Sequence, residues 1–260
     1  MAEQDIVLRT IDGAVATLTI NRPDKLNALN IPTREAIVSH LEELEVDKSV
    51  RVVVITGAGD KSFIAGADIK EFEGRSPVDQ FEIMRHRSVF EALAAFSKPT
   101  IAAINGFCLG GGCELAMAAD IRIASEKAKL GQPEINLGLL PGGGGTQRLP
   151  RLVGLGAAFK LMYTGEMIKA DEALRIGLVD EVVSVDGFSD RVAELAQNIA
   201  GKSPVALRLI KEAVRASVRT PLDEGLRHES SLFGLAFASE DMAEGVDAFL
   251  NKREAKFTGR

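Results

Sequence analysis

The stretch NGFCLGGGCELAMAAD, residues 105–120, places three consecutive glycines directly before a segment of helical character. Glycine is a poor helix former, so Gly110, Gly111 and Gly112 need a reason to stand at a helix entrance. One reason is structural, because a strand and a helix without side chains can pack closely. The other is functional, because the unpaired N–H groups of a helix start attract an anionic oxygen, which glycine allows to come close. Glu114 would lie within one turn of that oxygen, where it could act as an acid or base.

Short apolar segments surround this stretch and predict an α/β layered domain. Residues 50–57, 99–106 and 120–125 are bounded by glycine, proline or polar residues, as is typical of buried strands. Residues 78–96 and 113–119 have helical character, and helices that alternate with strands favour layered packing.

The two ends of the chain have different patterns. Residues 5–20 predict two paired strands around Asp12-Gly13, and a helix follows over residues 31–44. After a glycine-rich loop at 138–145 the pattern becomes mostly helical. Because a helix must break at Gly201-Lys202-Ser203-Pro204, we predict a core domain over residues 1–200 and a C-terminal helical region over 201–260.

The amino-acid composition limits which molecules this chain is expected to bind and where it is expected to occur. The chain has 260 residues, of which 46% are hydrophobic, so a sizeable core is expected. Its formal net charge of −6 argues against general affinity for nucleic acid or an anionic membrane surface, since both require a basic field. The only cysteines are Cys108 and Cys113, and the first residues do not resemble a secretion signal, so we expect a cytoplasmic protein.

Several familiar site motifs are missing from the sequence. The glycine clusters match neither G-x-G-x-x-G nor a P-loop, and no G-x-S-x-G occurs. His40, His86 and His228 are far apart and have no metal-binding companions, so no metal site is expected. Cys113 has no histidine close in sequence to activate it, which favours a buried thiol over a nucleophile.

Two further segments carry candidate chemistry. In GQPEINLGLLPGGGGTQRLPRL, residues 131–152, Glu134 precedes an apolar stretch, which is an unusual place for a solvated charge. A loop-end or helix-start glutamate would also explain that position. In SFIAGADIKEF, residues 62–72, Ala65-Gly66-Ala67 offers another backbone with small side chains after a strand.

Together, SFIAGADIKEF, INGFCLGGGCELAMAADIRIAS and GQPEINLGLLPGGGGTQRLPRLVG resemble the three signature segments of the enoyl-CoA hydratase (crotonase) family. Their order and spacing match from about residue 5 to the C terminus. The resemblance implies an α/β fold built as a crotonase-like spiral of strand-strand-helix turns. It also implies that the C-terminal helical region assembles a homotrimer, often a dimer of trimers.

The resemblance assigns roles at the reaction centre. The backbone N–H groups of Ala67 and Gly111 would form an oxyanion hole for the thioester oxygen. Glu114 would act as the base toward water and Glu134 as the proton donor to C2, while Gly142 resembles a backbone contact close to that water.

The resemblance also assigns a coenzyme A site. The positions implied in this chain are Lys25, Leu26, Ala28, Ala65, Asp68, Ile69 and Lys70. Phe249 and Lys252 match positions that reach the nucleotide end from a neighbouring subunit. Coenzyme A is part of the substrate, and no separate cofactor is implied.

The implied activity is hydration of a trans-2-enoyl-CoA to a 3-hydroxyacyl-CoA. The alternatives are another acyl-CoA activity of the family, such as an enoyl-CoA isomerase, and a non-catalytic RNA-binding homologue. Two intact glutamates and the acidic balance favour the hydratase. The chain departs from the usual family pattern at Gly143 in the GGGG run and at Ile64, and both departures could alter the acyl pocket.

Overall fold

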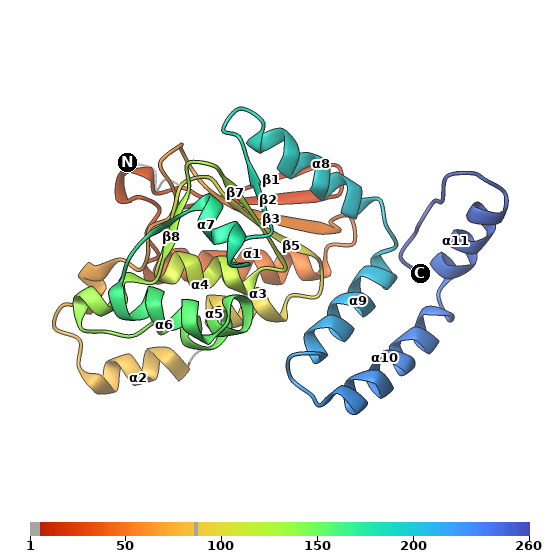
Figure 1. The fold of residues 1–260 in the computed structure, drawn as a ribbon. Helices are drawn as coiled ribbons and strands as arrows, with labels where there is room; N and C mark the ends of the chain where they lie inside the picture. Colours follow the sequence, from red (N-terminus) through yellow and green to blue (C-terminus); the bar gives the residue numbers. More distant parts are fainter. Residues whose placement is uncertain (1–5, 86–87) are drawn as a thin grey trace.

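The computed structural model describes residues 6–85 and 88–260, and the strands of these residues form two sheets (Figure 1). The larger sheet has the order β1-β2-β3-β5-β7-β10 and the smaller one β4-β6-β8-β9. The larger sheet contains β1 (Val7–Asp12), β2 (Val15–Ile20), β3 (Val52–Gly57), β5 (Thr100–Ile104), β7 (Ile121–Ser125) and β10 (Glu181–Val183). The smaller sheet contains β4 (Ser62–Ile64), β6 (Phe107–Leu109), β8 (Lys129–Gly131) and β9 (Ile168–Lys169).

Helices follow the strand pairs and fill the C-terminal part of the chain. The α-helices are α1 (Ile31–Val46), α2 (Pro77–Arg85), α3 (Val89–Ala95), α4 (Gly111–Ala118), α5 (Gly145–Val153), α6 (Leu155–Thr164), α7 (Ala170–Arg175), α8 (Phe188–Ala200), α9 (Pro204–Ala216), α10 (Leu222–Ala236) and α11 (Glu240–Leu250). Short 3₁₀ helices are η1 (Pro23–Lys25), η2 (Ile69–Phe72) and η3 (Pro133–Leu137).

The chain builds both sheets by repeated turns. β1 and β2 form the predicted antiparallel hairpin, and the larger sheet continues in parallel through β3, β5, β7 and β10. β3, β5 and β7 are each followed by a strand of the smaller sheet and then by helix. This repetition is the spiral of strand-strand-helix turns that the resemblance implies, and the expected α/β fold class is confirmed.

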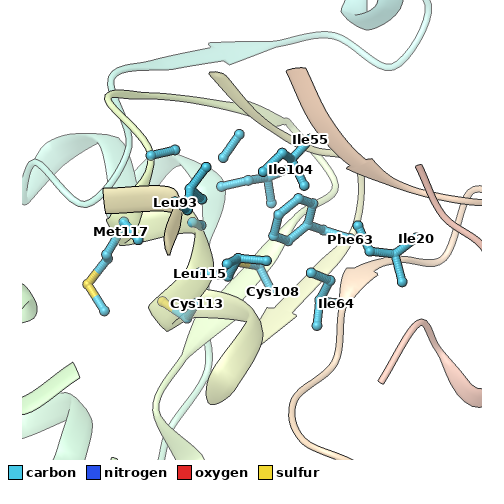
Figure 2. Close-up of a cluster of buried hydrophobic side chains, with 14 of the residues drawn as sticks. Ile20, Ile55, Phe63, Ile64, Leu93, Ile104, Cys108, Cys113, Leu115 and Met117 are labelled. Atoms are coloured by element: carbon cyan, nitrogen blue, oxygen red, sulfur yellow. The ribbon is translucent and has the colours of Figure 1, made fainter. Parts of the chain in front are cut away.

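Helix α4 is buried in the main core (Figure 2). All its residues from Gly112 to Ala118 are buried, and Leu115 lies with Cys108 and Phe63 among apolar side chains of both sheets. A Cβ atom at Gly112 would lie only 2.0 Å from the carbonyl oxygen of Ile64. Gly112 is therefore the glycine that close packing requires, which leaves Gly110 and Gly111 for another explanation.

Helix α8 covers the other face of the larger sheet. Its Phe188, Val192 and Ala196 pack with Val52 and Val54 of β3. The alternate residues of β3, Val53 and Ile55, belong to the main core, so side chains from this strand fill both sides of the sheet.

Residues 78–96, which the sequence predicts to have helical character, contain two helices, α2 and α3. α2 ends at Arg85, and α3 begins after Ser88, whose side chain accepts a hydrogen bond from the N–H of Glu91. Serine is a favoured N-cap residue, and this cap starts a new helix where apolar periodicity alone suggests continuation.

The C-terminal helices project away from the sheets (Figure 1). Asp120 anchors α9 to the core through Lys211 Nζ at 2.6 Å and Arg215 Nη2 at 2.9 Å. α8 ends at Ala200 and α9 begins at Pro204, so the predicted division at residue 201 falls between two helices. The division into two domains stays a prediction.

Of the helices in the described part of the chain, none has the length and apolar character needed to span a membrane.

Candidate active site

Glu114 lies in the first turn of α4 and is held by the glycine-rich loop that precedes α5. Its Oε1 accepts hydrogen bonds from the N–H groups of Gly143 at 2.6 Å and Gly145 at 2.7 Å. Within residues 6–85 and 88–260, Oε2 has no hydrogen-bond partner. The residue is only 3% exposed. One carboxylate oxygen therefore fixes the side chain, and the other is available for chemistry.

Glu134 approaches the same helix entrance from η3. Its side chain is half-buried, and its Oε1 would lie 2.9 Å from a Cβ atom built on Gly110. Gly110 has φ 49° and ψ −124°, a backbone conformation that favours glycine. The structure thus brings the two predicted glutamates to the glycine that precedes α4.

Burial raises the pKa of both carboxyl groups. The pKa of Glu134 rises to about 7 because of desolvation, and the nearby charge of Glu114 raises it further. Desolvation also raises the pKa of Glu114, although the N–H groups of Gly145 and Gly143 partly oppose the shift. With a pKa of about 7, Glu134 can hold a proton at neutral pH.

The raised pKa of Glu134 predicts a stability cost at high pH. A carboxyl whose pKa is higher in the folded state stabilises the fold below its unfolded value of 4.5, and this contribution is lost as pH rises through about 7. Glu134→Gln should therefore melt at a higher temperature than the native protein at pH 8, with the difference shrinking as pH falls toward 4. Thermal unfolding across this range checks the prediction, and a pH-independent difference would contradict it.

Two backbone amides lie beside the glutamates. Leu29 N–H donates to Gly66 O at 2.9 Å, and Asp68 N–H donates to Leu29 O at 2.9 Å. Because successive peptide groups of an extended chain point to opposite sides, the N–H of Ala67 faces away from Leu29. A Cβ atom on Gly111 would lie 3.6 Å from Ala67 N.

The amides of Ala67 and Gly111 are therefore neighbours at the start of α4. Neither donates a hydrogen bond to another residue in the described part of the chain. Both residues are partly accessible. A pair of accessible N–H groups next to two carboxyl groups can bind an oxygen that becomes negative during a reaction.

Known proteins resemble this chain over nearly its whole length. The family model described as enoyl-CoA hydratase/isomerase matches residues 10–260. This chain belongs to that family. It is 47% identical over 254 residues to the short-chain-enoyl-CoA hydratase of Clostridium acetobutylicum, covering 97% of each chain. It is also 47% identical over 261 residues to the crotonyl-CoA hydratase of Syntrophomonas wolfei, covering 100% of each.

Solved structures confirm the fold. The crystal structure of enoyl-CoA hydratase from Bacillus anthracis superposes with a TM-score of 0.94 and 38% identity, covering 98% of this chain and 100% of that one. The family membership expected from the three signature segments is confirmed.

In this member of the enoyl-CoA hydratase/isomerase family, two segments predicted to bind coenzyme A, residues 25–28 and 65–70, lie side by side. Ala65 N–H donates to Leu26 O at 3.1 Å. Leu26 has φ 51° and is 39% exposed, and Arg22 pairs with Asp68 at 3.0 Å. This hydrogen bond from Arg22 lowers the pKa of Asp68 and keeps its carboxylate ionised. Lys25, Ile69 and Lys70 are exposed along these segments, and Ala28 is partly buried.

Two predicted residues lie elsewhere. Phe249 is 84% exposed near the end of α11, and Lys252 follows it in a turn. Both belong to the projecting C-terminal region and not to the paired segments around residues 25–29 and 65–70, so their contact with coenzyme A from a neighbouring subunit stays a prediction (Figure 1).

The structure adds residues that sequence reasoning missed. Gly143 and Gly145 orient Glu114, whereas only Gly142 of this run is predicted as a site residue. Their signal is the GGGG run itself, but the run does not indicate which amides face inward. Buried Gln132 reaches the Glu134 carboxylate at 3.1 and 3.2 Å when its amide is oriented to donate. Across the described ranges, no group of three or more His, Cys, Asp or Glu residues is arranged to hold a metal ion, and His86 lies outside them.

Proposed function

We propose that this protein adds water across the C2=C3 bond of a trans-2-enoyl-CoA and produces a 3-hydroxyacyl-CoA. It is an enoyl-CoA hydratase, a hydro-lyase. The observation that carries this conclusion is the meeting of Glu114 and Glu134, both with raised pKa, at a helix entrance beside two accessible amides. The activities named for the relatives from C. acetobutylicum and S. wolfei support the same reaction.

The amides of Ala67 and Gly111 stabilise the charge that the reaction creates. An α,β-unsaturated thioester is electrophilic at C3, but attack there moves an electron pair onto the thioester oxygen. Two N–H groups fixed by β-type pairing and by a helix start need little reorganisation to donate to that oxygen. The enolate is thereby stabilised more strongly than the neutral substrate.

The two carboxyl groups move the protons. Oε2 of Glu114 accepts a proton from the water while the water oxygen forms a bond to C3. Glu134, which can be protonated near neutral pH, gives its proton to C2 as the enolate collapses. One water is consumed, and exchange with solvent restores the two protonation states. Residues of this chain handle every step, so we propose that no separate cofactor takes part.

A simple absorbance measurement distinguishes a hydratase from the alternative, an isomerase. Hydration of crotonyl-CoA removes the absorbance of the conjugated thioester, whereas conversion of a 3-enoyl-CoA to a 2-enoyl-CoA creates it. We expect the native protein to hydrate crotonyl-CoA much faster than it isomerises 3-hexenoyl-CoA. The reverse order of rates would assign the isomerase activity, and binding of RNA without turnover would assign the non-catalytic role.

We also propose where coenzyme A binds. Coenzyme A would lie along the paired segments of residues 25–29 and 65–70, near the exposed Lys25 and Lys70.

We also propose that the protein is cytoplasmic, because both cysteines are free and buried, which fits a reducing compartment.

We expect a homotrimer or a dimer of trimers in solution. The C-terminal helices expose large apolar side chains, among them Phe233 at 67%, Leu250 at 73% and Phe249 at 84%. A cluster of such exposed groups is typical of a surface that another protein covers. Light scattering at micromolar concentration should give the mass of three or six chains. A stable monomer would exclude the proposed contribution of Phe249 and Lys252 from a neighbouring subunit.

A further inference from the structure

We propose that Phe90 limits the length of the acyl chain and makes this protein selective for short enoyl-CoA substrates. The inference rests on the proposed function, because it concerns the carbon chain beyond the atom that receives water. Its basis is that the Phe90 ring lies against Gly143, next to the Glu114 carboxylate, and also lines a large cleft.

The Phe90 ring and the Glu114 carboxylate lie against the same glycine. A Cβ atom on Gly143 would lie 2.4 Å from Phe90 Cε2 and 2.7 Å from Glu114 Oε2. Since the N–H of Gly143 holds the other oxygen, Oε2 is the atom that must contact the attacking water. That water bonds to C3, so C4 and the rest of the acyl chain begin close to the ring.

Phe90 also lines a cleft. It has a volume of about 980 Å³ and lies between α1, α3, residues 142–144 and α5. This is near the upper end of the roughly 300–1,000 Å³ found for small-molecule sites. Its lining is mixed: Phe90, Val38 and Val89 are apolar, and arginine and glutamate side chains supply much of the rest. Gly143 is shared with the reaction centre. Glu114 and Glu134 do not line the cleft. Because Phe90 and Gly143 adjoin Glu114 and also line the cleft, a long acyl chain that enters this volume from the reaction centre would run alongside the Phe90 ring.

The Phe90 side chain packs against the main core, and the helix that carries it is fixed there. Phe90 follows the capped start of α3, where Ser88 accepts from Glu91 N–H at 3.2 Å. On the same helix, Val89 and Leu93 are buried in the main core, and α3 packs against α4, which carries Glu114. Displacing the ring would disturb this packing, so a bulky chain is disfavoured and the single carbon beyond C3 in crotonyl-CoA is accepted.

The test compares kcat/KM for crotonyl-CoA, 2-hexenoyl-CoA and 2-decenoyl-CoA in native protein, Phe90→Ala and Phe90→Leu. Since one methylene that fits or fails to fit a pocket changes kcat/KM by about 10–200-fold, we expect the native value to fall at least roughly 100-fold from C4 to C10. Phe90→Ala should lower this C4-to-C10 ratio at least about tenfold, and Phe90→Leu by less. Phe81→Ala is the matched control, because Phe81 lies on α2, is 64% exposed and does not line the cleft. It should leave the ratio unchanged.

An unchanged ratio in folded Phe90→Ala and Phe90→Leu would overturn the inference, as would a native rate independent of chain length. If circular dichroism shows that Phe90→Ala does not fold, the more conservative Phe90→Leu decides. Failure of the native protein to hydrate any of the three substrates would instead overturn the proposed function and this inference with it. The two failures are therefore distinguishable.

Discussion

Gly111→Pro should lower kcat for crotonyl-CoA hydration by roughly 10²- to 10³-fold, the usual cost of losing one oxyanion-hole donor. The substitution removes the backbone N–H at the first position of α4, where proline is well tolerated by helices. A Cβ atom there has its nearest neighbour, Ala67 N, at 3.6 Å, an ordinary contact distance. The Cβ atom should therefore cause no crowding, and the loss should come from the amide nitrogen, where the proline Cδ takes the place of the donated hydrogen.

Gly111→Ala is the matched control because it adds a side-chain carbon but keeps the N–H group. It should lose far less activity than the proline variant. Gly110→Ala would be a poor control, since its Cβ would collide with Glu134 Oε1 and its φ is positive. Near-native kcat in Gly111→Pro protein that shows native circular dichroism would exclude the oxyanion role of Gly111.

Glu114→Gln and Glu134→Gln should each lower kcat by roughly 10²- to 10⁴-fold, because glutamine cannot exchange the proton that each carboxyl transfers. Glutamine at position 114 retains an oxygen that can accept from the N–H groups of Gly143 and Gly145, so the loop should remain in place. KM should change little, since coenzyme A supplies most of the ground-state binding. Initial rates with crotonyl-CoA measure both effects.

The double variant should be much less impaired than the product of the two single effects, because both groups act on one water. In an isomerase, one of the two substitutions would be nearly silent. A native hydration rate in either single variant would therefore remove that glutamate from the mechanism.

The larger sheet could be predicted from the sequence because its central strands are continuous apolar segments with clear boundaries. The smaller sheet could not, since β4, β6 and β8 have three residues each, too few for any periodicity. These short strands nevertheless position the site. β4 leads into Ala67, β6 into Gly111 and β8 into Glu134.

The candidate site is also only partly predictable from the sequence. Glu114 and Glu134 stand out as carboxylates in apolar surroundings beside glycine, and the structure brings both to Gly110. The direction of the Glu114 carboxylate depends on which amides of residues 142–145 face inward, and this is set by tertiary packing. The sequence likewise does not indicate that Phe90 lies next to the site, because an aromatic residue near a helix start is common in the core of any protein.

The source of the new hydroxyl group tests the central claim most directly. Native protein is incubated with crotonyl-CoA in water enriched in ¹⁸O, and the product is analysed by mass spectrometry, with the Glu114→Gln, Glu134→Gln double variant as the control. We predict 3-hydroxybutyryl-CoA carrying one ¹⁸O atom at C3, formed far faster by the native protein than by the control. Absence of this product, or its formation at the same rate by the double variant, would contradict water addition by the two glutamates.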